Sequence, residues 1–130
     1  MLALALASLL AAAPDVSGTY RVETTKTLKV KKGETATGKV EVVPRADAHV
    51  SPDAPISLAL SSGPSLKLAK EKLGRPDAKG TQAKGVVFDV PFTAASAGKD
   101  EVRGTLTFFI CTEKLCERQK REIAMAVEVQ

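Results

Sequence analysis

Most of the chain beyond Gly18 alternates between apolar and polar residues. A period of two places successive side chains on opposite faces of a β-strand, with one face buried and the other in water. Roughly six or seven short segments show this pattern, and their apolar positions form the predicted core. These positions are Tyr20, Val22, Leu28, Val30, Val40, Val42, Ile56, Leu58, Leu60, Val86, Phe88, Val90, Phe92, Val102, Leu106, Phe108, Ile110, Ile123, Met125, Val127 and Val129.

Turn sequences separate these segments. Lys32-Gly33 and the cluster Ser61-Ser62-Gly63-Pro64 are two of them. About six or seven strands of this kind in about 110 residues predict an all-β fold, an immunoglobulin-like antiparallel β-sandwich. We place this single domain over residues 19–130. Trp is absent, so the domain is not of the antibody type.

Three stretches are less regular. Residues 65–73 (SLKLAKEKL) fit either a short helix that begins at Ser65 or a strand through Leu66 and Leu68, and we favour the strand. Residues 74–85 are polar and broken by glycine and proline, so we expect a mobile surface loop there. Pro91 interrupts the run from Val86 to Phe92, which predicts an edge strand.

The first 13 residues (MLALALASLLAAA) form an uncharged apolar run. The run is too short to span a bilayer and has the length of the apolar region of a signal peptide. We therefore expect residues 1–18 to be a signal peptide, with the mature chain beginning between Pro14 and Tyr20. The mature chain would then be periplasmic, without stable insertion in the membrane. The alternative is that this run is a buried element of the domain.

Composition and charge exclude several classes of function. The 130 residues are 44% hydrophobic and 26% charged, and the formal net charge of +4 does not form the dense basic stripe of a nucleic-acid-binding protein. His49 stands in a polar stretch without a serine nucleophile motif, so hydrolase chemistry has no support and we expect a surface or loop residue. We expect no cofactor.

Cys111 and Cys116 are the only cysteines. In an exported chain they can form one intramolecular disulfide. A strand through Phe108 and Ile110 precedes the pair and the last strand follows it, so the two Cβ atoms can meet across a hairpin within the roughly 3.5–4.5 Å that a disulfide needs. Because Phe108 and Ile110 point inward, the alternation places Cys111 on the exposed face.

Such a bridge allows more than one role. Its short ring contributes roughly 2 kcal/mol of stability, and an exposed sulfur can be attacked by an incoming thiolate. Basic residues around the pair outnumber acidic ones, which favours a thiolate. The basic residues are Lys114, Arg118, Lys120 and Arg121, and the acidic ones are Glu113 and Glu117. Alternatively, the disulfide can be purely structural and only hold the two strands of the hairpin together. As a zinc site, two cysteines and the distant His49 supply too few ligands, so we expect no metal.

The hairpin sequence TLTFFICTEKLC, together with an export signal and a β-sandwich of this size, resembles the N-terminal domain of the bacterial thiol:disulfide interchange protein DsbD, also described as a disulfide bond corrector domain. The likeness extends from the turn Lys31-Lys32-Gly33-Glu34 through Ala48-His49-Val50 and Pro55 to the last strand. It implies an immunoglobulin-like domain of the Gram-negative periplasm that takes electrons from a membrane partner and passes them to oxidised proteins. Cys111 and Cys116 would be the redox pair, with Cys116 as the attacking thiolate.

Two functions therefore stand. The first, favoured by the resemblance, is a periplasmic thiol-disulfide exchange module that acts as a thiol:disulfide oxidoreductase through Cys111 and Cys116. Its partner would be a thioredoxin-like protein or a membrane thiol carrier in a separate chain. The alternative is a non-catalytic immunoglobulin-like binding or assembly module with a structural disulfide.

Overall fold

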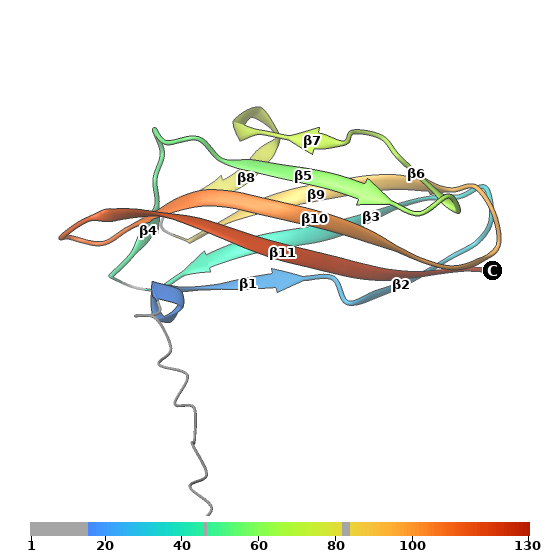
Figure 1. The fold of residues 1–130 in the computed structure, drawn as a ribbon, viewed down its shortest axis with the longest axis horizontal. Coiled ribbons are helices and arrows are strands. Elements are labelled where there is room, and N and C mark those ends of the chain that lie inside the picture. The colour runs from blue at the N-terminus through green and yellow to red at the C-terminus, as the bar shows by residue number, and fades with distance from the viewer. Residues whose placement is uncertain (1–15, 46, 82–83) are drawn as a thin grey trace, which may run out of the picture.

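The computed structural model describes residues 16–45, 47–81 and 84–130, which form two β-sheets packed face to face (Figure 1). Residues 1–15, which hold most of the signal peptide predicted over residues 1–18, lie outside the described part of the chain. Within the described ranges the helical elements are two short 3-10 turns, η1 (Val16–Thr19) and η2 (Arg75–Asp77). The predicted all-β fold is confirmed.

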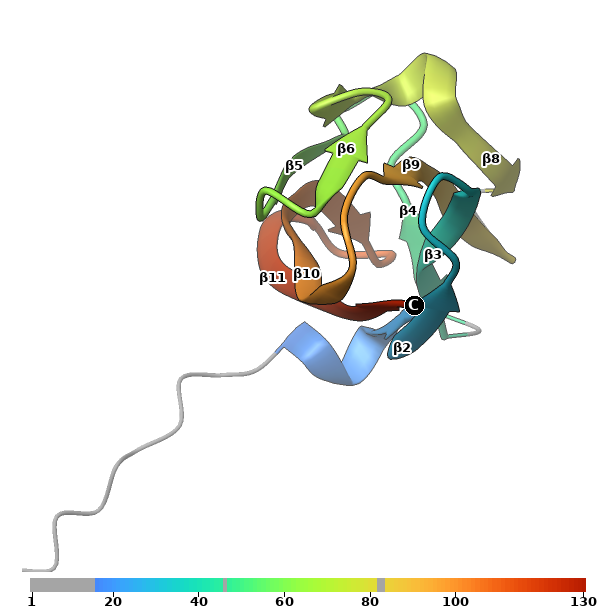
Figure 2. The ribbon, with the colours of Figure 1, turned by 90° about the vertical axis from the view of Figure 1, so that its right-hand side faces the viewer.

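Each sheet is built from strands that are distant in the sequence, and the end view of Figure 2 shows β5, β10 and β11 on one side and β3, β8 and β9 on the other. Sheet A contains, in order, β1 (Tyr20–Thr24), β3 (Thr35–Pro44), β9 (Gly85–Ala94) and β6 (Leu66–Leu68), with β8 (Ala78–Thr81) also on β9. Sheet B contains β2 (Thr27–Val30), β11 (Cys116–Val129), β10 (Gly98–Cys111), β5 (Ser57–Ser62) and β7 (Lys72–Leu73), with β4 (His49–Val50) also on β10. The pairs are antiparallel except β2 with β11, which is parallel.

The N-terminal segment changes sheets between β1 and β2. Thr25 N still donates to Lys39 O of sheet A at 3.0 Å, whereas Lys26 O already accepts from Ala126 N of sheet B at 2.9 Å. As a result, β2 covers only the last part of β11, from Ala126 to Val129.

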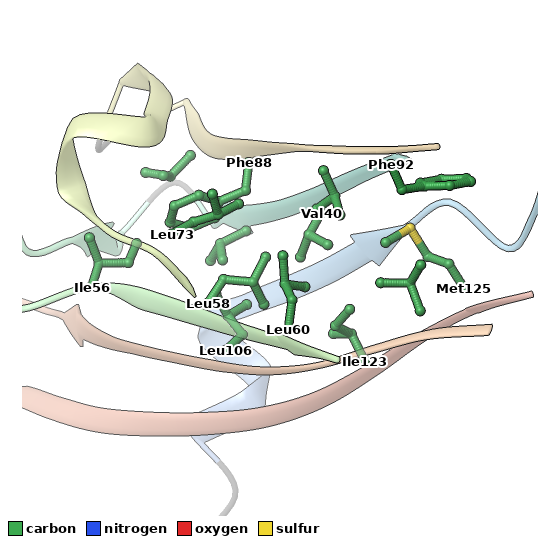
Figure 3. Packing of buried hydrophobic residues seen from close by; sticks show 14 of the residues in the cluster. Val40, Ile56, Leu58, Leu60, Leu73, Phe88, Phe92, Leu106, Ile123 and Met125 are labelled. Carbon is green, nitrogen blue, oxygen red and sulfur yellow. The ribbon is translucent and has the colours of Figure 1, made fainter. Parts of the chain in front are cut away.

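The core lies between the sheets, where the predicted apolar positions meet (Figure 3). Val40, Phe88 and Phe92 of sheet A face residues such as Leu58 and Leu106 of sheet B, and all five are fully buried. The predicted positions are buried except Val22 and Leu28, which are partly buried against the same cluster. The prediction of which alternate positions face the core is therefore confirmed.

Two glycines let large core side chains approach the backbone, from the opposite sheet at Gly38 and from neighbouring strands of the same sheet at Gly104. A Cβ on Gly38 of β3 would collide with the sulfur of Met125. A Cβ on Gly104 of β10 would lie 3.0 Å from Cδ1 of both Leu58 and Ile123. At each position the missing side chain makes room for a larger neighbour.

The expectation that residues 86–92 form an edge strand is wrong. β9 is an inner strand, paired with β3 on one side and with the short strands β6 and β8 on the other. Ala69 N donates to Pro91 O at 3.2 Å, so the nitrogen of Pro91 faces the same side, at the gap between β6 and β8. No ladder hydrogen bond to β3 is lost there, which explains why an inner strand accepts this proline.

The region after residue 64 is more regular than the sequence suggests. The favoured strand reading of residues 65–73 is confirmed by β6 and β7. The mobile loop expected over residues 74–85 is wrong for the described residues, because η2 is followed directly by β8 on β9. Lys79 Nζ donates to Asp89 at 2.8 Å across this pair, and Gly80 supplies the positive φ of 95° at its end.

Candidate functional site: the disulfide hairpin and its open edge

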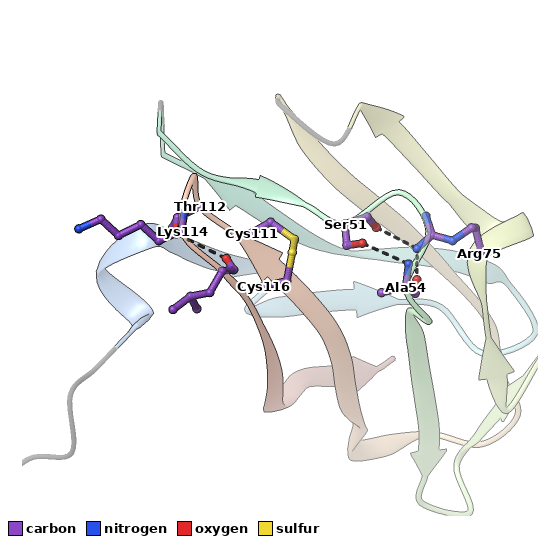
Figure 4. Close-up of a disulfide and its surroundings, with 8 residues drawn as sticks. Ser51, Ala54, Arg75, Cys111, Thr112, Lys114 and Cys116 are labelled. Carbon is purple, nitrogen blue, oxygen red and sulfur yellow. Dashed lines mark hydrogen bonds between the residues drawn. A yellow bond between two sulfur atoms is a disulfide. The ribbon is translucent and has the colours of Figure 1, made fainter.

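Cys111 and Cys116 close the tip of the long β10–β11 hairpin (Figure 4). The two residues are directly opposite in the register, with Cα atoms 4.0 Å apart and a disulfide between their sulfurs. Thr112 N donates to Leu115 O at 2.9 Å in the turn beyond them. The predicted disulfide and hairpin are thus confirmed, and the ladder runs unbroken from the bridge to Val129.

The expected exposure of Cys111 is wrong. Cys111 is 3% exposed, whereas Cys116 is exposed. The alternation of residues along β10 cannot reveal this difference in exposure, because the difference depends on which strands lie next to each cysteine. Cys111 lies between β11 on one side and His49 of β4 on the other, while Cys116 is on the outermost strand at this level. An incoming thiolate can therefore reach the sulfur of Cys116 far more easily than that of Cys111.

The segment that covers Cys111 is fixed from two sides. Ser51 N, directly after β4, donates to Phe109 O at 2.9 Å. The guanidinium of Arg75 donates to the carbonyl oxygens of Ser51 and Ala54, which ties this loop to η2 (Figure 4). His49, expected as a surface or loop residue, is exposed but belongs to β4, opposite Cys111. A two-residue strand has too little periodicity for sequence reasoning to detect it.

The basic residues near the disulfide are not all directed towards it. Arg121 Nε donates to the hydroxyl of Tyr20 at 2.8 Å, and its guanidinium lies over the Tyr20 ring. Arg118 and Lys120 are exposed on the alternate positions of β11 that Cys116 shares. Of the basic residues expected to favour a thiolate, Arg121 therefore binds Tyr20 of β1 instead of facing the disulfide.

One side of β11 is unpaired over residues 117–125, and we call it the open edge. Among the described strands, β10 pairs with all of β11 on one side, but β2 pairs on the other side only from Ala126 onward. A groove of about 400 Å³ follows the open edge, between β11 and β1. Its lining residues are Tyr20, Arg21, Val22, Thr24, Arg121, Glu122, Ile123 and Ala124.

The described residues contain no group of three or more His, Cys, Asp or Glu side chains placed to hold a metal ion. In the same part of the chain, no helix has the length and apolar character needed to cross a membrane.

Sequence comparisons with protein-family models and with curated proteins give no match. Solved structures do match. The native form of Escherichia coli alpha-2-macroglobulin is similar over 85% of this chain and 7% of its own, with 12% identity and a TM-score of 0.52. The trypsin-activated form is similar over 84% of this chain and 7% of its own, with the same identity and TM-score.

AggA, the major subunit of aggregative adherence fimbriae type I from Escherichia coli, matches 85% of this chain and 94% of its own at 12% identity, with a TM-score of 0.49. This chain spans only 7% of the length of alpha-2-macroglobulin, and the identities are low. The similarity to alpha-2-macroglobulin therefore shows the fold alone. Together with the two packed sheets, it establishes an immunoglobulin-like β-sandwich that carries a hairpin disulfide.

Proposed function

We propose that this chain is an exported, non-catalytic immunoglobulin-like binding or assembly module with a structural disulfide. The observation that carries the proposal is the burial of Cys111 between β4 and β11, in a bridge that continues the β10–β11 ladder. In this position the bridge holds the end of the hairpin together. The hairpin in turn presents the open edge of β11.

The same burial opposes disulfide exchange. In an exchange step the incoming thiolate forms a new bond with one sulfur, and the other sulfur leaves with the electron pair of the broken bond. Only Cys116 is exposed to attack, so the charge would develop on Cys111. A buried, weakly polar position disfavours a thiolate and makes it a poor leaving group.

Export is supported by the apolar leader and by the disulfide. Disulfides persist in oxidising compartments and are rare in the cytosol. The periplasm is the compartment that fits both features, and the resemblance to the DsbD N-terminal domain points to the same place. The binding partner would then be another exported protein or a surface component.

Thiol-disulfide exchange is the second candidate, and one specific observation favours it: the exposed position of Cys116 on the outer strand. The Arg118 cation, which forms no ion pair among the described residues, lies two residues along the same face. In this function Cys116 would be attacked by a thioredoxin-like protein or a membrane thiol carrier, as the DsbD resemblance implies.

A redox titration separates the two functions. We expect the bridge to stay oxidised in glutathione buffers and to have a reduction potential below about −300 mV, as structural disulfides do. Mass spectrometry after alkylation of free thiols gives the oxidised fraction. A bridge that equilibrates with glutathione at a more oxidising potential would contradict the proposal.

A trapping experiment provides an independent readout. A thioredoxin that retains only its attacking cysteine accumulates a mixed disulfide with any bridge that it can open. We expect no such species with the wild-type domain, and the variant with Cys111→Ala and Cys116→Ala is the matched control. An accumulated mixed disulfide at Cys116 would establish exchange instead.

A further inference from the structure

We propose that the open edge of β11 binds an extended peptide strand that carries acidic residues at two alternate positions. This inference rests on the proposed binding function and names the kind of partner. The peptide would add to sheet B as a further strand, through main-chain hydrogen bonds to residues 118–124. Strand addition of this kind combines main-chain bonds for affinity with alternate side chains for specificity.

The hydrogen-bond pattern shows which backbone groups are available. Thr112 and Leu115 form a hydrogen-bonded pair, so Cys111 and Cys116 form a non-hydrogen-bonded pair, and the pattern alternates from there along β11. Even-numbered residues of β11 therefore direct their N–H and C=O groups away from β10. Ala126 confirms this alternation, because its N–H donates to Lys26 O, on the side of β11 that faces away from β10.

Four residues of the open edge consequently direct backbone groups away from β10 without a strand partner among the described residues, and the last two of them line the groove. They are Arg118, Lys120, Glu122 and Ala124. The carbonyl of Arg118 accepts the side-chain amide of Gln119 at 3.0 Å, which occupies one of these groups. The other groups form a row that matches the spacing of an extended chain.

The groove gives an added strand a place to lie. β1 diverges from β11 because the chain changes sheets at Thr25 and Lys26, and the space left between the two strands has a volume of about 400 Å³. Half-buried Val22 and buried Ile123 line its inner wall. Side chains of the peptide that point inward would meet these apolar groups, so small β-branched residues fit there.

The charges on the outer face of β11 determine which peptide residues fit opposite them. Arg118, Lys120 and Glu122 are exposed on that face, giving the pattern positive, positive, negative along the open edge. Arg118 and Lys120 form no ion pair within the described part of the chain, whereas Glu122 accepts a hydrogen bond from Thr105 at 3.1 Å. Residues directly opposite on a neighbouring strand interact most strongly. The complementary strand carries two acids opposite the cations and a base opposite Glu122.

Two peptides with uncharged, blocked termini have this charge pattern: KVEVE for antiparallel addition and EVEVK for parallel addition. The readout is amide hydrogen exchange followed by NMR. In the free protein we expect fast exchange at Arg118, Lys120, Glu122 and Ala124, and slow exchange at the intervening amides, which bond to β10. Saturation with one of the two peptides should slow exchange at Arg118, Lys120 and Glu122, which the five residues span, and leave Ala124 unchanged. The peptide KVKVK, with lysine in place of both acids, should bind at least about 5-fold more weakly, because in either orientation it replaces two attractive cross-strand pairs with repulsive ones.

Proline at position 120 tests the main-chain contact directly. The N–H of Lys120 points away from β10 at the open edge, so Lys120→Pro removes a donor of this edge and spares the ladder with β10. We expect the variant to fold and to lose protection by either peptide. Lys120→Gln is the matched control; it removes one charge, keeps the donor and should weaken binding about 2-fold to 5-fold. Glu122→Pro, whose nitrogen faces the same side, repeats the test at a second position.

Several results would overturn the inference. One is slow exchange of the four edge amides in the free protein, and another is the failure of both KVEVE and EVEVK to protect Arg118, Lys120 and Glu122. Unchanged peptide binding by the folded proline variants would equally contradict it. Protection that appears without peptide as the protein concentration rises would show that a second copy occupies the edge instead. None of these results depends on the redox titration, so the proposed function and this inference can fail separately.

Discussion

Arg121 Nε donates a hydrogen bond to the hydroxyl oxygen of Tyr20 at 2.8 Å, which links β11 to β1 across 101 positions of sequence. The hydroxyl group in turn donates to Oε1 of Gln119 at 2.8 Å. The Tyr20 ring meets Phe108 edge-to-face, with centroids 5.0 Å apart. One side chain thus joins the edges of both sheets at the groove, with its ring in the core and its hydroxyl group bonded to polar side chains.

Tyr20→Phe removes the hydroxyl group and keeps the ring contact with Phe108. We expect the free energy of unfolding to fall by about 1–2 kcal/mol, because two hydrogen bonds are lost and their partners are only partly able to reach water. Urea denaturation measures the change. In a double-mutant cycle with Arg121→Ala, the two effects should not add, and strict additivity would show that the bond between them contributes nothing.

Gly38→Ala should destabilise the sandwich, because its new methyl group collides with the sulfur of Met125. We expect a loss of about 1–3 kcal/mol, the usual cost of overpacking a core, measured by thermal or chemical denaturation. Adding Met125→Val to Gly38→Ala should recover part of the loss by making room. Gly74→Ala is the matched control, since its Cβ would meet only Pro76 Cδ at 3.8 Å. An equal loss at both glycines would contradict the packing argument.

Removing the disulfide should reduce stability without changing the fold. The variant with Cys111→Ala and Cys116→Ala should lose roughly 2 kcal/mol, because the ring closed by the bridge is short. Single serine substitutions break the same bridge but should differ from each other. Cys111→Ser buries a hydroxyl group and should be less stable than Cys116→Ser, whose hydroxyl group is exposed. Equal stabilities of the two serine variants would show that Cys111 is not buried in solution.

The alternation of apolar residues predicted the core because each long strand has one buried face. Val102, Leu106, Phe108 and Ile110 occupy one side of β10 and are all buried. Such a pattern identifies the face of a strand but not its neighbours in the sheet. For that reason it could not show that β9 is an inner strand or that Cys111 is covered by β4.

The short and polar elements also escaped prediction. β4 has two residues and β8 consists of AKGT, so neither offers a hydrophobic period. In the first half of β11 the inward positions are Glu117, Gln119 and Arg121, which the pattern excluded from the last strand. Two of these three side chains bond to Tyr20 at the groove, a contact that depends on the tertiary fold.

The carboxylate of Asp77 makes stability depend on pH in the acid range. Gly74 N donates to Asp77 Oδ2 at 2.9 Å, and Lys70 Nζ donates to Oδ1 at 2.9 Å. The bond from Gly74 and then the bond from Lys70 hold the pKa of Asp77 below its ordinary value of 3.8. Asp89 has a lowered pKa for a similar reason, chiefly its hydrogen bond from Lys79. Both contacts tie η2 and β8 to their surroundings.

A carboxyl group with a lowered pKa in the folded state stabilises the fold fully above its unfolded pKa, and this stabilisation is lost as the pH falls through the folded value. We therefore expect the free energy of unfolding to decrease as the pH falls below about 4. Asp77→Asn should be less stable than the wild type at neutral pH and should show a shallower decrease in acid, in urea titrations from pH 7 to pH 2. Asp53→Asn, at an exposed carboxyl group, is the control. If Asp77→Asn kept the full acid dependence, the contacts with Gly74 and Lys70 would not be its source.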